Sequence, residues 1–150
     1  MKVRTIVISG LLTLLVLVLA ACADAVSSAP TAASAAQGLP VLSKNKFGFI
    51  DLKVGQLANS MTGKNFTLVN VHVPDQGSLP NTDLSIPFDQ ITRNLDKLPG
   101  KDVAIVVYCR SGGMSTQVAA ALAAAGYTKI YELDGGFNAW KAAGHELLKI

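Results

Sequence analysis

The segment YCRSGGMS, residues 108–115, places a cysteine, an arginine and two adjacent glycines where an apolar run gives way to an alanine-rich one. Glycine tolerates backbone angles that other residues avoid, so this turn can direct several backbone N–H groups inward and form a nest for an anion. A helix that opens near Met114 or Ser115 would add the positive end of its dipole. We therefore expect an anion-binding loop built from six residues: Arg110, Ser111, Gly112, Gly113, Met114 and Ser115.

Cys109 stands at the rim of this loop. A thiolate in such a polarised position is stabilised, so the pKa of the thiol should fall and its sulfur should be nucleophilic near neutral pH. The alternative is a small buried cysteine that is chemically inert. We favour a reactive Cys109, because it ends the apolar run and the two residues that follow it, Arg110 and Ser111, are polar.

The rest of the chain alternates short apolar runs with helix-like segments. Strands are predicted at residues 47–50, 66–71, 84–86, 103–108 and 129–133, and helices at 53–61, 88–95, 116–125 and 136–143. The run at 103–108 has no polar alternation, as expected for a strand that is covered on both faces. This order predicts an α/β fold: a single domain with a central parallel sheet and helices on both faces. Sites in such folds gather at the carboxyl ends of the strands, which is where Cys109 lies.

The N-terminal segment has the three parts of an export signal. Lys2 and Arg4 precede an apolar core that is short for a membrane span, and LAAC, residues 19–22, follows it. This ending resembles the bacterial lipobox, which implies cleavage before Cys22 and attachment of lipid to that residue. The alternative is an ordinary signal peptide or an N-terminal anchor, and either way the domain would lie outside the cytoplasm. We predict a membrane-anchored bacterial lipoprotein with a signal peptide at 1–21, a low-complexity tether at 22–40 and one domain at 41–150.

Composition narrows the possible partners. Lys2 and Arg4 are two of the 13 basic residues, so a chain without residues 1–21 would carry 11 basic against 10 acidic residues. There is no basic cluster and no basic stripe with aromatic residues between, so nucleic-acid binding has no support. No spacing of Cys and His predicts a metal site, and no cofactor is implied. We see no heptads and expect a monomer.

Two kinds of cysteine enzyme use a loop of this general type. Cysteine phosphatases carry an arginine after five intervening residues, and that arginine clamps the phosphate. In this chain the corresponding position is Ser115. The missing arginine argues against phosphate-ester hydrolysis, and Arg110 does not replace it by spacing.

The second kind of cysteine enzyme is indicated by a resemblance to a known family. YCRSGGMS resembles the active-site loop of the rhodanese-like domains, whose common form is Cys-Arg-Ser-Gly-x-Arg-Ser. LDGGFNAWKAAGHEL, residues 133–147, is similar to the closing segment of that family, with its Gly-Gly and Ala-Trp pairs. LVNVHVP, residues 68–74, and GSLPNTDLSIP, residues 77–87, stand where the family has an Ile-Asp-Val-Arg strand and a Gly-His-Ile-Pro segment. These matches cover nearly all of residues 41–150 in the expected order.

The resemblance implies a single α/β domain that transfers sulfur. The Cys109 thiolate would attack the outer sulfur of a donor, either the small anion thiosulfate or a persulfide or polysulfide, and would hold that sulfur as a persulfide. A thiophilic acceptor, such as cyanide or a thiol, would then remove it. The backbone N–H groups of Arg110 to Ser115 would hold the anionic end of the donor.

Four positions depart from the family pattern, and one of them is Ser78, which replaces the histidine of the Gly-His-Ile-Pro segment. Met114 stands in place of the second arginine of the loop, which removes a cation beside the thiolate and should weaken the attraction for thiosulfate. Asn70 and His72 replace the usual Asp and Arg, which would leave a neutral hydrogen-bonding arrangement; His72 could carry protons or simply hydrogen-bond a loop. The changes at the other three positions favour an alternative, a non-catalytic binding module for a sulfur compound or a protein partner. Persulfide formation on Cys109 separates the two functions.

Overall fold

A parallel β-sheet organises the part of the chain that the computed structural model describes, residues 38–149. Its strands are β1 (Ile50–Leu52), β2 (Thr67–Asn70), β3 (Leu84–Ser85), β4 (Ile105–Tyr108) and β5 (Ile130–Leu133). They lie in the order β1-β5-β4-β2-β3, and every neighbouring pair is parallel. The predicted parallel sheet is confirmed, and β4, the strand that leads into Cys109, lies at its centre.

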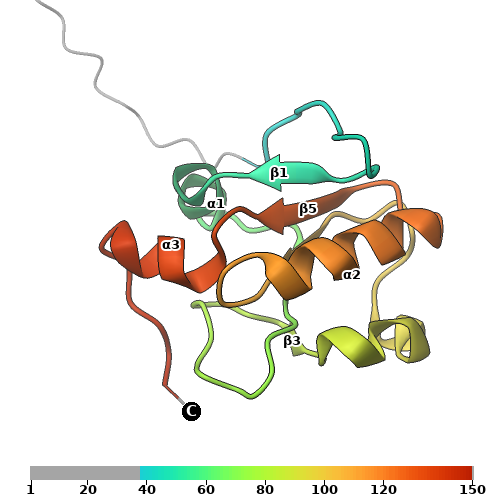
Figure 1. The fold of residues 1–150 in the computed structure, drawn as a ribbon. Coiled ribbons are helices and arrows are strands. Elements are labelled where there is room, and N and C mark those ends of the chain that lie inside the picture. The colour runs from blue at the N-terminus through green and yellow to red at the C-terminus, as the bar shows by residue number, and fades with distance from the viewer. Residues whose placement is uncertain (1–37, 150) are drawn as a thin grey trace, which may run out of the picture. The chain divides into compact units, whose positions relative to one another are not determined.

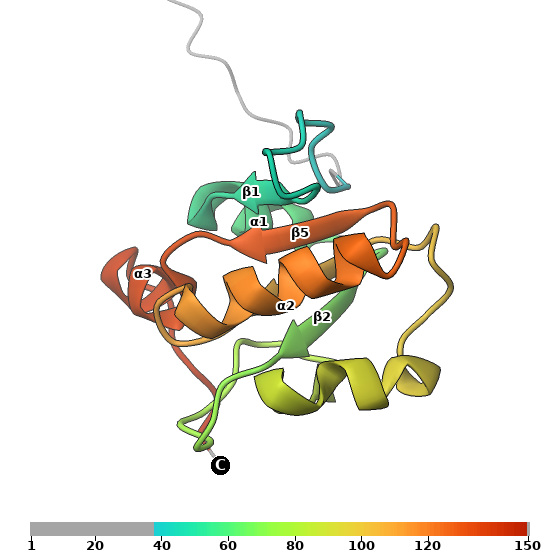
Figure 2. The same cartoon turned by 45° about the vertical axis from the view of Figure 1, so that its right-hand side comes forward.

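Helices cover both faces of this sheet, as predicted (Figures 1 and 2). On one face lie α2 (Gly113–Ala124) and two 3₁₀ helices, η1 (Phe88–Arg93) and η2 (Leu95–Lys97). On the other face lie α1 (Val54–Ser60) and α3 (Gly136–Ala142). Figure 2 shows α2 running across the front of the sheet, with η1 below it. The sheet is therefore the middle one of three layers.

Successive residues of β4 divide between two apolar clusters. Ile105, Val107 and Cys109 belong to the cluster under α2 and η1, whereas Val106 and Tyr108 belong to the cluster under α1 and α3. All five side chains are at most 2% exposed. Because both faces of this strand are buried, apolar residues are needed at every position, and this explains the absence of polar alternation in the sequence.

The first strand begins later than the predicted range of 47–50. Gly48 adopts a left-handed conformation with φ of 86°, which favours glycine, and the backbone N–H of Asn45 donates to the carbonyl of Phe49 over 2.7 Å. These features make residues 45–49 a turn. Only from Ile50 onward does the chain pair with β5.

Two helical segments also differ from the prediction. Residues 88–95, predicted as one helix, form the short 3₁₀ helices η1 and η2, which are separated at Asn94 by a non-helical backbone conformation. α2 begins before the predicted start at residue 116, because Gly112 adopts a left-handed conformation with φ of 99° and helical geometry follows at once. Met114 and Ser115 therefore belong to the first turn of α2.

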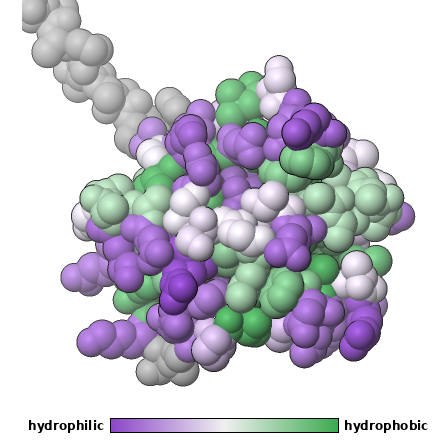
Figure 3. Space-filling view, in the orientation of Figure 1, coloured by the Kyte–Doolittle hydropathy of each residue, from purple (hydrophilic) through white to green (hydrophobic). Residues whose placement is uncertain are grey.

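The outer surface of α2 consists largely of small residues. Ala120 and Ala121 are partly exposed and Ala124 is exposed, whereas Gln117 is a larger polar residue on the same surface. Figure 3 shows a white to pale green band over this helix, bordered by polar residues. Alanine is the strongest helix former, so this sequence can form a regular helix without presenting a strongly hydrophobic face to the solvent.

The predicted export features lie outside the described residues. The signal peptide at 1–21, the lipidation of Cys22 and most of the tether at 22–40 therefore stay predictions. Within residues 38–149, no helix combines the length and the apolar character needed to cross a membrane.

Candidate active site

Three elements converge on Cys109: the end of β4, the first turn of α2 and the middle of β5. The thiol is free and 2% exposed. Its Sγ accepts a hydrogen bond from the backbone N–H of Gly112 over 3.2 Å and from Ser115 Oγ over 3.3 Å. Gly112 follows the turn inward because its left-handed backbone carries no side-chain penalty. The loop therefore directs donors at the sulfur, while the binding of a substrate anion there stays a prediction.

These donors change the ionisation of Cys109. Burial by itself raises the pKa of a thiol, because the charged form loses its water. The hydroxyl of Ser115 and the backbone N–H groups of Ser115, Ser111 and Met114 lower it, and the pKa of Cys109 falls below its ordinary value. A thiol of this kind carries more thiolate at neutral pH, and the thiolate is the nucleophile. The geometry thus favours a reactive cysteine over an inert one.

The side chains of the loop point in different directions. Arg110, Ser111 and Gly113 are exposed, and Arg110 supplies the loop's only charged side chain. Met114 is partly buried and packs against the apolar cluster under α2. The position where the family motif has its second arginine is therefore occupied by an apolar side chain. Any anion that reaches the loop meets backbone N–H groups and one cation.

A buried carboxyl group lies behind the loop and was not predicted from the sequence. Glu132 of β5 is 3% exposed, and its Oε1 lies 2.5 Å from Ser115 Oγ. Burial raises the pKa of Glu132 to about 7; the bond from Ser115 opposes this shift, and the charges of Asp134 and Asp51 add to it. The sequence does contain one indication of this site, since Glu132 is the single charged residue within an otherwise apolar strand, IYEL.

Asn70 forms the neutral arrangement expected at the end of β2. Its side chain is 1% exposed, its Nδ2 donates to the carbonyl of Gly77 over 3.2 Å, and its Oδ1 accepts from the backbone N–H of His72 over 3.0 Å. The ring of His72 is also buried and lies edge-on to Phe137, with 5.3 Å between the ring centroids. Neither ring nitrogen has a hydrogen-bond partner within residues 38–149, so the ring does not tie down a loop there.

The start of α3 holds the carbonyl groups of the loop. The backbone N–H of Phe137 donates to the carbonyl of Cys109, and that of Asn138 donates to the carbonyl of Arg110, both over 3.0 Å. A Cβ atom on Gly136 would lie only 2.2 Å from the carbonyl oxygen of Cys109, and this glycine has a φ of 55°. Glycine at this position therefore allows α3 to approach the backbone of Cys109.

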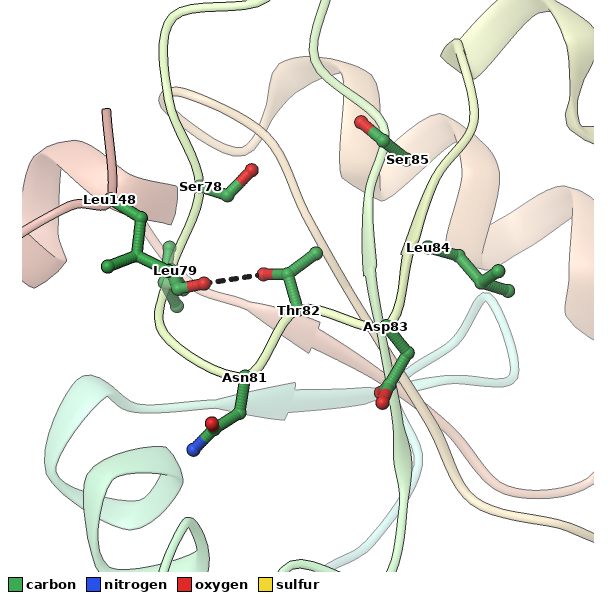
Figure 4. Close-up of a pocket in the computed structure, with 8 residues that line it drawn as sticks. All are labelled: Ser78, Leu79, Asn81, Thr82, Asp83, Leu84, Ser85 and Leu148. Atoms are coloured by element: carbon green, nitrogen blue, oxygen red, sulfur yellow. Dashed lines mark hydrogen bonds between the residues drawn. The ribbon is translucent and has the colours of Figure 1, made fainter. Parts of the chain in front are cut away.

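A groove of about 460 Å³ follows the edge strand β3 (Figure 4). Figure 4 shows the hydroxyl of Thr82 directed at the carbonyl of Leu79, a hydrogen bond of 2.8 Å. The same hydroxyl lies 2.7 Å from the hydroxyl of Tyr108, so one lining residue of the groove is hydrogen-bonded to β4. None of its lining residues comes from the 109–115 loop, so this groove is separate from the candidate site at Cys109.

Comparisons with known proteins identify the family of the chain. Residues 65–143 match the model of the rhodanese-like domain. A sulfurtransferase of Allochromatium vinosum is 38% identical over 80 residues, which are 51% of this chain and 73% of that protein. The thiosulfate sulfurtransferase GlpE of Shewanella oneidensis is 33% identical over 98 residues, 63% of this chain and 95% of that protein. A solved rhodanese-like domain protein of Staphylococcus aureus is 29% identical, with a TM-score of 0.58, and the match covers 68% of this chain and 98% of that chain. The chain therefore belongs to the rhodanese-like domain family and is a rhodanese-type sulfurtransferase.

Proposed function

We propose that this sulfurtransferase acts outside the cytoplasm and carries sulfur as a persulfide on Cys109. One observation carries the assignment of the cysteine: a free thiol with a lowered pKa accepts hydrogen bonds from Gly112 and Ser115 at the carboxyl end of the central strand. The position of this thiol agrees with the rule that sites of parallel sheets gather at that end.

The reaction has two halves. In the first, the Cys109 thiolate attacks the outer sulfur of the donor; with thiosulfate, the S–S bond breaks and sulfite leaves with the electron pair. The product is a persulfide whose terminal sulfur is anionic, and the inward N–H groups of the loop stabilise that charge. In the second half, a thiolate or cyanide attacks the terminal sulfur, and the Cys109 thiolate is regenerated.

The loop favours a donor of low charge. Met114 is turned toward the apolar cluster, so Arg110 is the only side chain of the loop that can attract an anion by its charge. Thiosulfate is a dianion and gains most from nearby cations. We therefore expect a monoanionic persulfide to load Cys109 faster than thiosulfate, although thiosulfate is the substrate in the name of the GlpE relative.

The persulfide can be tested on the full chain, purified in detergent. Trypsin separates the two cysteines, because Cys109 lies in the peptide of residues 102–110 and Cys22 lies upstream of Lys44. After incubation with thiosulfate or polysulfide, the thiols are trapped with an alkylating reagent and the 102–110 peptide is analysed by mass spectrometry. We expect one added sulfur that cyanide or a thiol removes.

The Cys109→Ser variant is the matched control and should gain no sulfur in this peptide. If a reduced Cys109 reacts with the alkylating reagent yet no donor loads it, the persulfide proposal is wrong. The domain would then be a binding module, the alternative that the sequence left open.

The location is proposed from the LAAC segment and is tested separately. Expression in a bacterium with a labelled fatty acid should label the protein and bring it into the membrane fraction. Cys22→Ser should remove the label. A labelled Cys22→Ser variant, or a native chain that remains unlabelled, would contradict the lipoprotein assignment.

A further inference from the structure

The hydroxyl of Ser115 lies among three acceptors. Its Oγ is 2.5 Å from Glu132 Oε1, 3.1 Å from the carbonyl of Gly112 and 3.3 Å from Cys109 Sγ. A serine hydroxyl has a single hydrogen, so it can donate to only one of these groups at full strength. The proton carried by Glu132 therefore decides what Ser115 can offer to the sulfur.

The two protonation states of Glu132 give two arrangements. When Glu132 is protonated, its O–H donates to Ser115 Oγ, and the hydrogen of Ser115 is free to stabilise a thiolate on Cys109. When Glu132 is ionised, its carboxylate attracts the hydrogen of Ser115, and the sulfur keeps its own proton. The thiol and the carboxyl group are thus connected through one hydroxyl.

We propose that Glu132 accepts the proton of the Cys109 thiol, with the hydroxyl of Ser115 as the bridge between them. The S–H bond breaks and its proton passes to Ser115 Oγ, while the hydroxyl proton of Ser115 passes to Glu132 Oε1. No group is oxidised or reduced, and the pair keeps one negative charge throughout. Glu132 touches neither donor nor acceptor, so it is a positioning residue. The inference rests on the proposed function, because the thiol concerned is the one that would take up sulfur.

The surroundings of Glu132 suit a carboxyl group that takes up a proton near neutral pH. Asp51 is its partner in the register of β1 and β5, and Asp134 lies two residues farther along the chain. Asp51 accepts hydrogen bonds from the amide of Asn45, and Asp134 pairs with Lys53. Within residues 38–149, no ion pair involves Glu132 itself, so no contacting cation holds it in the ionised form.

The neighbours from the other two elements are uncharged or belong to the relay. On β4, the register partner of Glu132 is Val107, and Cys109 lies farther along the same face. On α2, the contact comes from Ser115. Burial raises the pKa of the acid to about 7 and the hydrogen bonds to the sulfur lower that of the thiol, so the two groups compete for one proton.

The test measures the ionisation of Cys109 without any sulfur donor. The full chain in detergent is alkylated with iodoacetamide at a series of values from about pH 5 to pH 10, and the rate is read from the 102–110 peptide. Coupled groups lose their protons in two macroscopic steps. We therefore expect two rises in the alkylation rate of the native chain, with a plateau between them.

The Glu132→Gln variant cannot take up the proton but keeps the volume and can still donate to Ser115. We expect a single rise, and in the plateau region a rate above that of the native chain, because the competitor of the thiol for the proton is gone. Glu146→Gln makes the same change on an exposed side chain and should keep both rises. Ser115→Thr retains a hydroxyl and should keep the rise that occurs at lower pH. Ser115→Ala lacks the hydroxyl and should reduce that rise severalfold.

A single rise in the native chain, or two unchanged rises in Glu132→Gln, would overturn the proposal. If Glu132→Gln does not fold, the comparison of Ser115→Thr with Ser115→Ala decides. Rises of equal size at lower pH in these two variants would show that the hydroxyl of Ser115 is not the bridge. The outcome is independent of sulfur transfer. If the chain shows two rises but forms no persulfide, the proton relay stands and the proposed function is wrong. If it forms a persulfide but shows a single rise, the proposed function stands and the relay is wrong.

Discussion

Replacing Gly136 by alanine tests how closely α3 must approach the loop. The new Cβ would lie 2.2 Å from the carbonyl oxygen of Cys109 and 2.8 Å from the carbonyl carbon of Arg110. Both neighbours are backbone atoms, so no flexible side chain can move aside. The two hydrogen bonds from α3 to these carbonyls must then lengthen, and the loop that surrounds the sulfur must shift with them.

The expected cost has two parts. An alanine with positive φ costs about 1–2 kcal/mol relative to glycine. Forcing an additional carbon into a packed site typically costs about 1–3 kcal/mol more. Gly136→Ala should therefore lower the free energy of unfolding by about 2–5 kcal/mol, a large part of the ordinary stability of a domain. A shift that weakens the bonds to the thiolate by about 1.4 kcal/mol would also slow persulfide formation about tenfold.

Gly144→Ala supplies the matched control. Gly144 also has a positive φ, of 87°, but nothing lies within 4 Å of its Cβ position. Urea denaturation of the two variants should show the backbone cost of about 1–2 kcal/mol in Gly144→Ala and the larger loss only in Gly136→Ala. Equal losses of stability, together with unchanged persulfide formation, would show that the close approach of α3 does not constrain the loop.

Three further predictions follow from the same structure. Met114→Arg places a cation beside the thiolate and should raise kcat/KM for thiosulfate about five- to tenfold. The rise for a monoanionic persulfide should be smaller. Salt screens the attraction between charges, so a gain that persists at high salt would contradict this explanation. Folding raises the pKa of Glu132 from 4.5 to about 7. Between these two pH values the native chain binds more protons than the unfolded chain. The free energy of unfolding should therefore fall by about 3 kcal/mol as the pH rises from 4.5 through 7. Glu132→Gln should flatten that fall in urea titrations at several pH values, and an unchanged slope would refute the assignment. Tyr108→Phe removes the acceptor of the buried N–H of Leu79 and should lower the free energy of unfolding by about 1–3 kcal/mol in urea denaturation. Tyr131→Phe should lower it less.

The central strands were predictable because burial on both faces leaves a clear pattern. The run at 103–108 is apolar at every position, and the structure places the side chains of β4 in two apolar clusters. The start of β1 was not predictable in this way. Phe47 and Phe49 read as strand residues, yet the left-handed backbone of Gly48 between them makes a turn. Local hydrophobicity records which residues are apolar, whereas the backbone angle of one glycine decides the conformation.

The candidate site was predictable in part. The two glycines of the loop indicate inward N–H groups, and Cys109 ends the apolar run. Glu132 was missed because its role depends on three elements that are distant in sequence. The register of β5 against β4 puts its carboxyl group on the face of Cys109, and the first turn of α2 then brings Ser115 between them. A single charged residue in an apolar strand indicates a special environment but does not identify its partner.

The contacts that α3 and β5 make with the loop have a consequence for the order in which the protein is synthesised. When the ribosome has just added residues 109–115, neither Glu132 nor the N–H groups of Phe137 and Asn138 exist yet. The nascent cysteine therefore behaves as an ordinary exposed thiol, and its activating surroundings arise only when the chain is nearly complete and folds. We proposed above that the protein acts outside the cytoplasm. If the chain crosses the membrane before it folds, the thiol becomes strongly nucleophilic only at its destination, where it no longer meets the thiols of the cytoplasm.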